Sequence, residues 1–124
     1  MLQTSHLIAF ASTTDLGRAR AFYEGVLGLP LVEENAYACV FDAQGTMLRI
    51  TAVGEVARPG YTVLGWRVDD IDDAVDQLTL DGVTFTRYDG MKQDSHGVWS
   101  TPNGDRVAWF TDPDGNVLSL TQFV

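Results

Sequence analysis

Hydrophobic positions along the chain change between two spacings, and these changes divide the sequence into predicted strands and helices. A largely apolar run at residues 7–12 predicts a strand, and Thr13-Thr14-Asp15 then offers residues that cap helix N-termini. Apolar residues next recur at helical spacing, at Leu16, Ala19, Phe22, Tyr23, Val26 and Leu27. We expect this helix to end at Gly28, because glycine favours the position after a helix and Pro30 prevents continuation.

The remaining elements of the first half are three short strands, and the second half repeats the pattern of the first. The strands are predicted at residues 31–34, 37–42 and 47–53, and residues 54–60 form a linker. A strand at residues 61–68 then precedes a helix that Asp69-Asp70 caps, with apolar Ile71, Ala74, Val75 and Leu78, and Gly82 at its end. Further strands are predicted at residues 83–88, 98–101, 106–111 and 117–123, with a polar loop at residues 89–97.

The two halves are related by a constant step. Asp15 and Asp69 are separated by 54 residues, and so are Gly28 and Gly82. This step predicts a duplicated strand-helix-strand-strand-strand unit, with modules at about residues 5–54 and 60–124. One such unit leaves a sheet face exposed, whereas two can close a common core. We therefore expect an α+β fold in which both modules form a single domain over residues 1–124.

The residues Asp112-Pro113-Asp114-Gly115-Asn116 predict a tight hairpin turn between the last two strands. Proline presets φ for the first corner of a turn, and aspartate tolerates the second. Glycine can then take a positive φ. This turn indicates architecture rather than activity, so the functional information lies in the side chains of the strands beside it.

Composition and charge exclude several classes of function. The 124 residues carry a net charge of −9, which argues against binding nucleic acid, whose phosphates require Lys and Arg. No apolar run approaches the length of a membrane span, and no secretory signal is visible, so we expect a cytoplasmic protein. The one cysteine, Cys39, lies in an apolar run, where a buried and unreactive thiol is expected.

Several motifs together resemble the vicinal oxygen chelate superfamily, which includes glyoxalase I, extradiol dioxygenases, fosfomycin resistance enzymes and bleomycin resistance proteins. They are Asp15-Leu16, Ala21-Phe22-Tyr23, Val26-Leu27-Gly28-Leu29, Val68-Asp69-Asp70-Ile71 with Ala74, and the turn at residues 112–116. The resemblance covers nearly the whole chain. It implies two βαβββ modules that form an open barrel of the glyoxalase and bleomycin-resistance type, with an active cavity across a homodimer.

The resemblance also implies four metal-ligand positions, typically His, Glu or Gln, on the concave strands. In this chain they fall on Ala9, Arg49, Val63 and Ser119. Alanine and valine have no donor atom, arginine repels a cation, and serine is a weak ligand. His6 and His96 match none of these positions. We therefore expect a member of the superfamily without the metal site, with no metal and no other cofactor.

The same resemblance, together with the alternation of side chains along the strands, implies a largely apolar cavity with a few polar and aromatic side chains. Its candidate ligand-binding residues are Arg49, Tyr61, Arg67, His96, Trp99, Trp109 and Ser119. Strand alternation puts Ala9 on the cavity face and Trp66 in the core. Two alternatives stay open: the arginines could instead pair with acidic residues, and the tryptophans could instead belong to the core or to a dimer interface. His96 could act as a base, but the sequence assigns it no partner carboxylate and no catalytic residue.

These observations favour a homodimeric protein that binds a small organic molecule without a metal. The ligand would be an aromatic or cationic compound such as an antibiotic, as in the bleomycin resistance proteins. The alternative is a lyase or dioxygenase of the same superfamily that uses this cavity with no metal or with a relocated one. A third possibility is a domain that only presents a surface to a partner. Enzymatic activity is left open, with binding preferred because the family metal ligands are absent.

Overall fold

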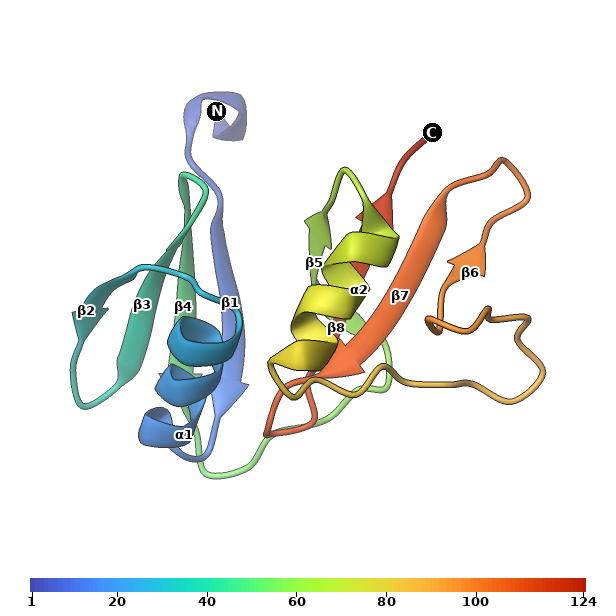
Figure 1. Ribbon diagram of the computed structural model, residues 1–124. Helices are drawn as coiled ribbons and strands as arrows, with labels where there is room; N and C mark the ends of the chain where they lie inside the picture. The colour runs from blue at the N-terminus through green and yellow to red at the C-terminus, as the bar shows by residue number, and fades with distance from the viewer. The chain divides into compact units, whose positions relative to one another are not determined.

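The computed structural model describes all residues from Met1 to Val124. A segment without helix or strand joins Ala52 to Thr62 and covers the predicted linker. The chain forms two compact units, Met1–Arg58 and Pro59–Val124, which divide within this segment (Figure 1). Each unit contains a four-stranded mixed sheet, so the predicted α+β class with two related modules is confirmed. That the two modules share one core stays a prediction.

The first unit follows the predicted order of elements. After a short 3-10 turn at Leu2–Thr4 come β1 (Ile8–Thr13), α1 (Leu16–Arg20), a π-helical segment (Ala21–Val26), β2 (Leu31–Glu34), β3 (Ala38–Ala43) and β4 (Thr46–Ala52). The strand order is β1-β4-β3-β2, and only β1 and β4 are parallel. The Asp15 carboxylate accepts a hydrogen bond from the Arg18 amide at 3.0 Å, so it caps α1 as predicted.

The predicted single helix over residues 16–27 changes its hydrogen bonding halfway. The Leu27 amide donates to the Phe22 carbonyl, which widens the last turn. This helical segment still buries Tyr23, whose ring centroid lies 5.9 Å from that of Phe41 on the sheet. Gly28 has φ +74°, as expected of a residue that ends a helix in the left-handed region.

The second unit contains β5 (Thr62–Arg67), α2 (Ile71–Leu80), β6 (Trp99–Ser100), β7 (Arg106–Thr111) and β8 (Val117–Gln122). Its strand order is β5-β8-β7-β6, with β5 and β8 parallel. The Asp70 carboxylate caps α2 by accepting from the Asp73 amide at 3.1 Å, and Gln122 Oε1 accepts from the Ile71 amide. The helix therefore begins where the sequence predicted.

The strand predicted at residues 83–88 is wrong, because this segment is irregular. Only the Thr86 amide reaches the sheet, where it donates to the Trp109 carbonyl at 2.7 Å. The side chain of Gln93 satisfies the neighbouring backbone groups instead. It accepts from the Tyr88 amide at 2.8 Å and donates to the Thr86 carbonyl at 3.0 Å. A side chain from the following loop thus replaces the hydrogen bonds of a strand ladder.

The hairpin turn before β8 has the predicted geometry. Asp112 Oδ1 accepts from the amides of Asp114 and Asn116 at 3.0 Å, and Asp112 Oδ2 accepts from Asn116 Nδ2 at 2.8 Å. Gly115 has φ +86°, which favours glycine. The turn fixes the register in which Trp109 on β7 lies opposite Ser119 on β8. No helix in the protein is both long and apolar enough to cross a membrane.

Candidate functional site

The two faces of the second sheet differ in what covers them. Phe110 and Leu118 are register partners, both fully buried, and belong to the face that α2 covers (Figure 1). Arg106 lies on the same face and bonds to Asp72 of α2 at 2.9 Å. Because side chains alternate along a strand, Trp109 points to the opposite face, which α2 leaves uncovered. This uncovered face carries the candidate site.

Aromatic side chains gather on the uncovered face. Trp99 pairs with Val107 in the register, so it shares the face of Trp109. The two indole rings are 6.3 Å apart at 33°, and the ring of Tyr88 meets that of Trp109 edge-on at 5.6 Å. Both indoles are half-buried, and Tyr88 is 36% exposed. The cluster is therefore partly accessible to solvent, and partly exposed aromatic rings are suited to stacking against a planar ligand.

An open cavity of about 760 Å³ borders this cluster. It is lined by Trp99 and Ser100 of β6, by Val98, and by the loop residues Asp89, Gly90, Met91, Lys92 and Asp94. Its size lies within the range of small-molecule sites, and it combines an aromatic wall with charged and hydroxyl groups. Trp99 is the residue that the cavity shares with the aromatic cluster.

Two of the predicted polar residues lie on the same face. Ser119 is the register partner of both Trp109 and Gly65 and is 6% exposed. A Cβ atom on Gly65 would come within 2.9 Å of the Ser119 hydroxyl oxygen, so the glycine leaves space over this serine. Arg67 lies two residues further along β5, and its guanidinium stands 5.7 Å from the centre of the Phe123 ring.

The other predicted residues are not gathered with the aromatic cluster. Arg49 belongs to the first unit, where its register partner on β1 is Phe10. Tyr61 precedes β5 and is 68% exposed. Neither Arg49 nor Arg67 forms an ion pair with an acidic residue of this chain, so the alternative of internal pairing finds no support. Trp66 lies on the α2 side of its sheet, as predicted for a core residue.

The residues at the family metal positions do not fit a divalent cation. The assignment of Ala9 to the cavity face is wrong, because Ala9 pairs with Leu48 and shares its face, the opposite one from Arg49. The residue that shares the face of Arg49 is Phe10, which has no donor atom. With Val63 on β5 and Ser119 on β8, these positions supply no imidazole or carboxylate.

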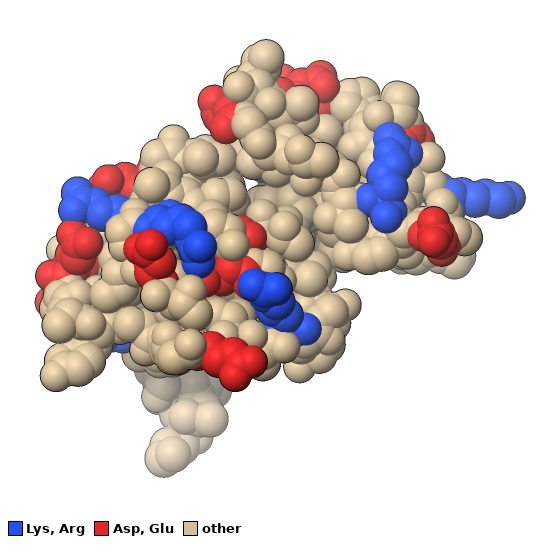
Figure 2. Space-filling model, turned by 90° about the horizontal axis from the view of Figure 1, so that it is seen from below, with Lys and Arg blue, Asp and Glu red and all other residues tan.

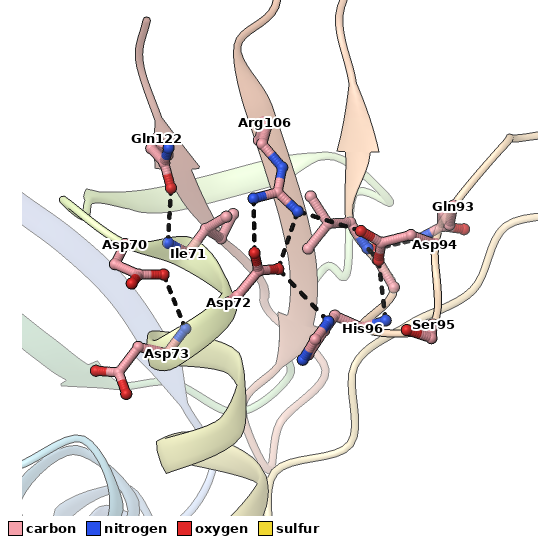
Figure 3. Close-up of polar contacts among 12 residues, drawn as sticks. Asp70, Ile71, Asp72, Asp73, Gln93, Asp94, Ser95, His96, Arg106 and Gln122 are labelled. Carbon is pink, nitrogen blue, oxygen red and sulfur yellow. Dashed lines mark hydrogen bonds and ion pairs between the residues drawn. The ribbon is translucent and has the colours of Figure 1, made fainter.

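His96 does not lie on the uncovered face, because its side chain lies against α2 (Figure 3). Its Nε2 is 3.0 Å from Asp76 Oδ1, and its Nδ1 is 3.4 Å from Asp72 Oδ1. The sequence assigned His96 no partner carboxylate, and the structure supplies two, those of Asp72 and Asp76. The two aspartates are four residues apart, so the sequence alone indicates that their carboxylates share one face of the helix. The sequence offered no means of bringing the loop of His96 to that face.

An ion-pair network joins His96 to residues that the sequence did not single out. Arg106 donates to both carboxylate oxygens of Asp72 at 2.9 Å and to Asp94 Oδ2 at 3.2 Å. Hydrogen bonding to Arg106 lowers the pKa of Asp72, and hydrogen bonding to Asp72 raises the pKa of Arg106. Ligand atoms of Asp72, Asp94 and His96 lie within 4.8 Å of one another, as a relocated metal would need. Arg106 already bonds to the carboxylates of Asp72 and Asp94, so a metal ion at this cluster would have to compete with its guanidinium.

The few basic side chains expected from the composition, eight Lys and Arg against 17 Asp and Glu, are also sparse on the surface. On the face that Figure 2 shows, basic side chains are separated from one another and no extended basic patch forms. This face therefore offers no surface suited to a phosphate backbone.

Comparison with known proteins gives the family. A model of the Glyoxalase/Bleomycin resistance protein/Dioxygenase superfamily matches residues 5–120. The metallothiol transferase FosB of Lysinibacillus sphaericus (strain C3-41) is 29% identical over 111 residues, which cover 85% of this chain and 72% of the transferase. The fosfomycin resistance protein FosX from Listeria monocytogenes has the same fold, with a TM-score of 0.77, 14% identity, and coverage of 98% of this chain and 94% of that chain.

Lactoylglutathione lyase from Agrobacterium tumefaciens also shares the fold, with a TM-score of 0.73 at 19% identity, over 95% of this chain and 93% of that chain. The names of these proteins describe different chemistries on one architecture, so the fold alone does not choose among them. The family model spans both units and includes the strands that carry the aromatic cluster. The chain therefore belongs to the Glyoxalase/Bleomycin resistance protein/Dioxygenase superfamily.

Proposed function

We propose that this protein binds a small aromatic compound, such as an antibiotic, on the uncovered face of its second sheet without using a metal. The observation that carries the proposal is the cluster of Trp99, Trp109 and Tyr88 beside an open cavity of about 760 Å³. Stacked aromatic side chains supply a large, rigid contact area at low entropic cost. Ser119 and Arg67 on the same face add a hydroxyl and a guanidinium that can hydrogen-bond to an oxygen of the ligand.

The side chains at the family metal positions support the metal-independent part of the proposal. Neither Ala9 nor Phe10, which shares the face of Arg49, offers a side-chain lone pair, Val63 offers none either, and Arg49 brings a positive charge. The net charge of −9 favours the approach of a cationic ligand over an anionic one. Binding without turnover is then the activity that these residues support best, as in the bleomycin resistance proteins that give the superfamily part of its name.

The proposal includes a cytoplasmic homodimer. Ile8, Phe10 and Met47 lie on the face of the first sheet that α1 does not cover, and their exposed fractions are 45%, 57% and 41%. Large apolar side chains gathered on one face favour association with another surface. A second copy of the chain would cover them, and light scattering at micromolar concentration tests this. A strictly monomeric protein would contradict the dimer.

The binding proposal is tested with three probes that share one ring system and differ in charge. They are naphthylmethylammonium, naphthalenemethanol and naphthylacetate, and each is titrated calorimetrically against the protein, with bleomycin as a larger aromatic cation. We expect the cation to bind most tightly. Trp99→Ala and Trp109→Ala should weaken binding by about tenfold or more, whereas Tyr37→Ala should not, because Tyr37 is 79% exposed in the first unit. Unchanged binding in both tryptophan variants would refute the proposed site.

Metal analysis separates this proposal from its main alternative. The similarity to a metallothiol transferase would predict a bound divalent metal and a thiol substrate. The fold shared with a fosfomycin resistance protein would add fosfomycin as the second substrate. We expect instead no stoichiometric Zn, Ni, Mn or Fe in the purified protein and no consumption of fosfomycin. One metal ion per chain, together with fosfomycin turnover that a chelator abolishes, would refute the binding proposal and show that the protein is a metal-dependent enzyme.

A further inference from the structure

The loop that forms one wall of the ligand cavity is held from the opposite side of the sheet. Asp94 lines the cavity, and its Oδ1 accepts from the amides of His96 and Val98 at 2.9 and 3.0 Å. Its backbone amide donates to the Val98 carbonyl at 2.9 Å, which closes the loop on itself. Val98 is 2% exposed and directly precedes Trp99. The conformation around Asp94 therefore fixes the residue at which β6 begins and the position of the Trp99 indole.

Arg106 connects this loop to α2. One carboxylate, that of Asp72, receives both terminal nitrogens of the guanidinium, and one of these nitrogens also reaches Asp94 (Figure 3). Only 25% of the Arg106 side chain is exposed, so solvent screens these bonds less than it screens a fully exposed pair. A planar guanidinium that bonds one partner in a bidentate manner has little freedom to release the other.

His96 supplies a second attachment of the same loop to α2. Its ring nitrogens approach Asp72 and Asp76, which lie one turn apart on the helix. Two attachment points resist rotation of the loop, which a single ion pair would permit. Gln93 adds a third constraint inside the loop, because its side chain donates to the Gly97 carbonyl at 2.8 Å.

We propose that Asp72, Asp94, His96 and Arg106 form a clasp that positions the cavity loop and Trp99 for ligand binding. These are positioning residues: they act on the ligand only through the loop. The part of this inference that concerns affinity rests on the proposed function. The part that concerns the loop stands on the geometry of the clasp and does not require a ligand. The clasp lowers the entropy that the cavity loses when a ligand binds, because the wall is already ordered.

Hydrogen exchange of the ligand-free protein tests the clasp. Asp72→Asn removes one anionic partner of Arg106 and His96 and keeps the shape of the side chain. Asp73→Asn is the matched control, because it changes the charge equally on the same helix at an exposed position that is outside the clasp. We expect the amides of His96 and Val98 to exchange about tenfold faster in Asp72→Asn and at the wild-type rate in Asp73→Asn. Equal rates in the two variants would overturn the clasp.

Two further readouts separate positioning from general destabilisation. The indole N–H resonance of Trp99, identified with a Trp99→Phe variant, should move in Asp72→Asn, while amides of the β5–β8 pair keep their protection. Faster exchange spread evenly over the unit would mean that Asp72 only stabilises the fold. Asp72→Glu should restore part of the loop protection, because the longer carboxylate can still meet Arg106.

The affinity arm uses naphthylmethylammonium as the probe. We expect Asp72→Asn to weaken its binding about three- to tenfold relative to Asp73→Asn, although Asp72 does not line the cavity. If the wild-type protein does not bind the probe, the proposed function is at fault, and the exchange data still decide whether the clasp exists. If the probe binds and Asp72→Asn changes exchange but not affinity, the loop is held but does not serve the ligand.

Discussion

Replacing Trp109 by alanine should weaken folding more than replacing Trp99, although both indoles are half-buried in the same cluster. Trp109 contacts two aromatic rings, those of Trp99 and Tyr88, at 6.3 and 5.6 Å. Trp99 contacts only one aromatic ring, that of Trp109. Trp109 is therefore the centre of the cluster, and its removal should break both ring contacts.

The size of the difference follows from the geometry. An aromatic pair contributes about 0.5–1.5 kcal/mol beyond the area it buries. Truncation of a buried tryptophan costs about 3–5 kcal/mol, and a half-buried one belongs at or below the lower end. We therefore expect Trp109→Ala to lower the free energy of unfolding by about 3 kcal/mol. Trp99→Ala should cost about 1 kcal/mol less, the contribution of the Tyr88–Trp109 pair.

Urea denaturation followed by far-UV circular dichroism measures these free energies, because the peptide backbone dominates that signal and each variant is compared with its own folded and unfolded baselines. A double-mutant cycle with Tyr88→Ala then isolates the pair terms. We expect coupling of about 1 kcal/mol between Tyr88 and Trp109 and none between Tyr88 and Trp99. Equal costs for the two tryptophan variants, or coupling of Tyr88 to Trp99 alone, would refute the proposed arrangement.

Three further predictions concern single groups. Arg106 lowers the pKa of Asp72, so the contribution of the Asp72 carboxylate to stability is present above the unfolded-state pKa and is lost as pH falls through the folded-state pKa, below about pH 4. Asp72→Asn should therefore reduce the acid dependence of stability measured by urea denaturation at several pH values, and an unchanged dependence would contradict this. Gly65→Ala should cost about 1 kcal/mol because its Cβ would lie 2.9 Å from the Ser119 hydroxyl oxygen; the same change in a Ser119→Ala background should cost less, and identical costs in both backgrounds would exclude the steric explanation. Asp112→Ala should lower the free energy of unfolding by about 3–5 kcal/mol, since this buried carboxylate accepts two backbone amides and one side-chain amide in the turn; thermal unfolding at the wild-type temperature would show that the turn does not need it.

Much of the fold was accessible from the sequence because local signals and the internal repeat agreed. Asp15 and Asp70 cap the two helices, and Gly28 and Gly82 end them with positive φ. Each of these features depends on a few neighbouring residues, so a pattern along the chain is enough to predict it. The boundary between the two compact units, at Arg58 and Pro59, likewise falls within the predicted linker at residues 54–60.

The errors arose where contacts distant in sequence decide the outcome. Residues 83–88 have the composition of a strand, but Gln93 takes the backbone groups that a strand would have paired. Ala9 was assigned to the wrong face because alternation gives relative parity along one strand and not the register with β4. The clasp was missed for the same reason, since Arg106 is 34 residues from Asp72.

The candidate site was partly accessible. Trp99 and Trp109 were predicted on neighbouring strands, and their rings do contact each other. Tyr88 was not predicted there, because its place depends on the irregular segment that replaced a strand. The ligand role of these residues, and of Arg49, Tyr61, Arg67 and Ser119, stays a prediction.

Calorimetric titration of naphthylmethylammonium into the wild-type protein, with and without EDTA, tests the central claim most directly. We predict binding with the same affinity in both conditions, because the aromatic cluster and its neighbours supply the whole site. Binding that disappears with EDTA and returns when a divalent metal is added would contradict a metal-independent site.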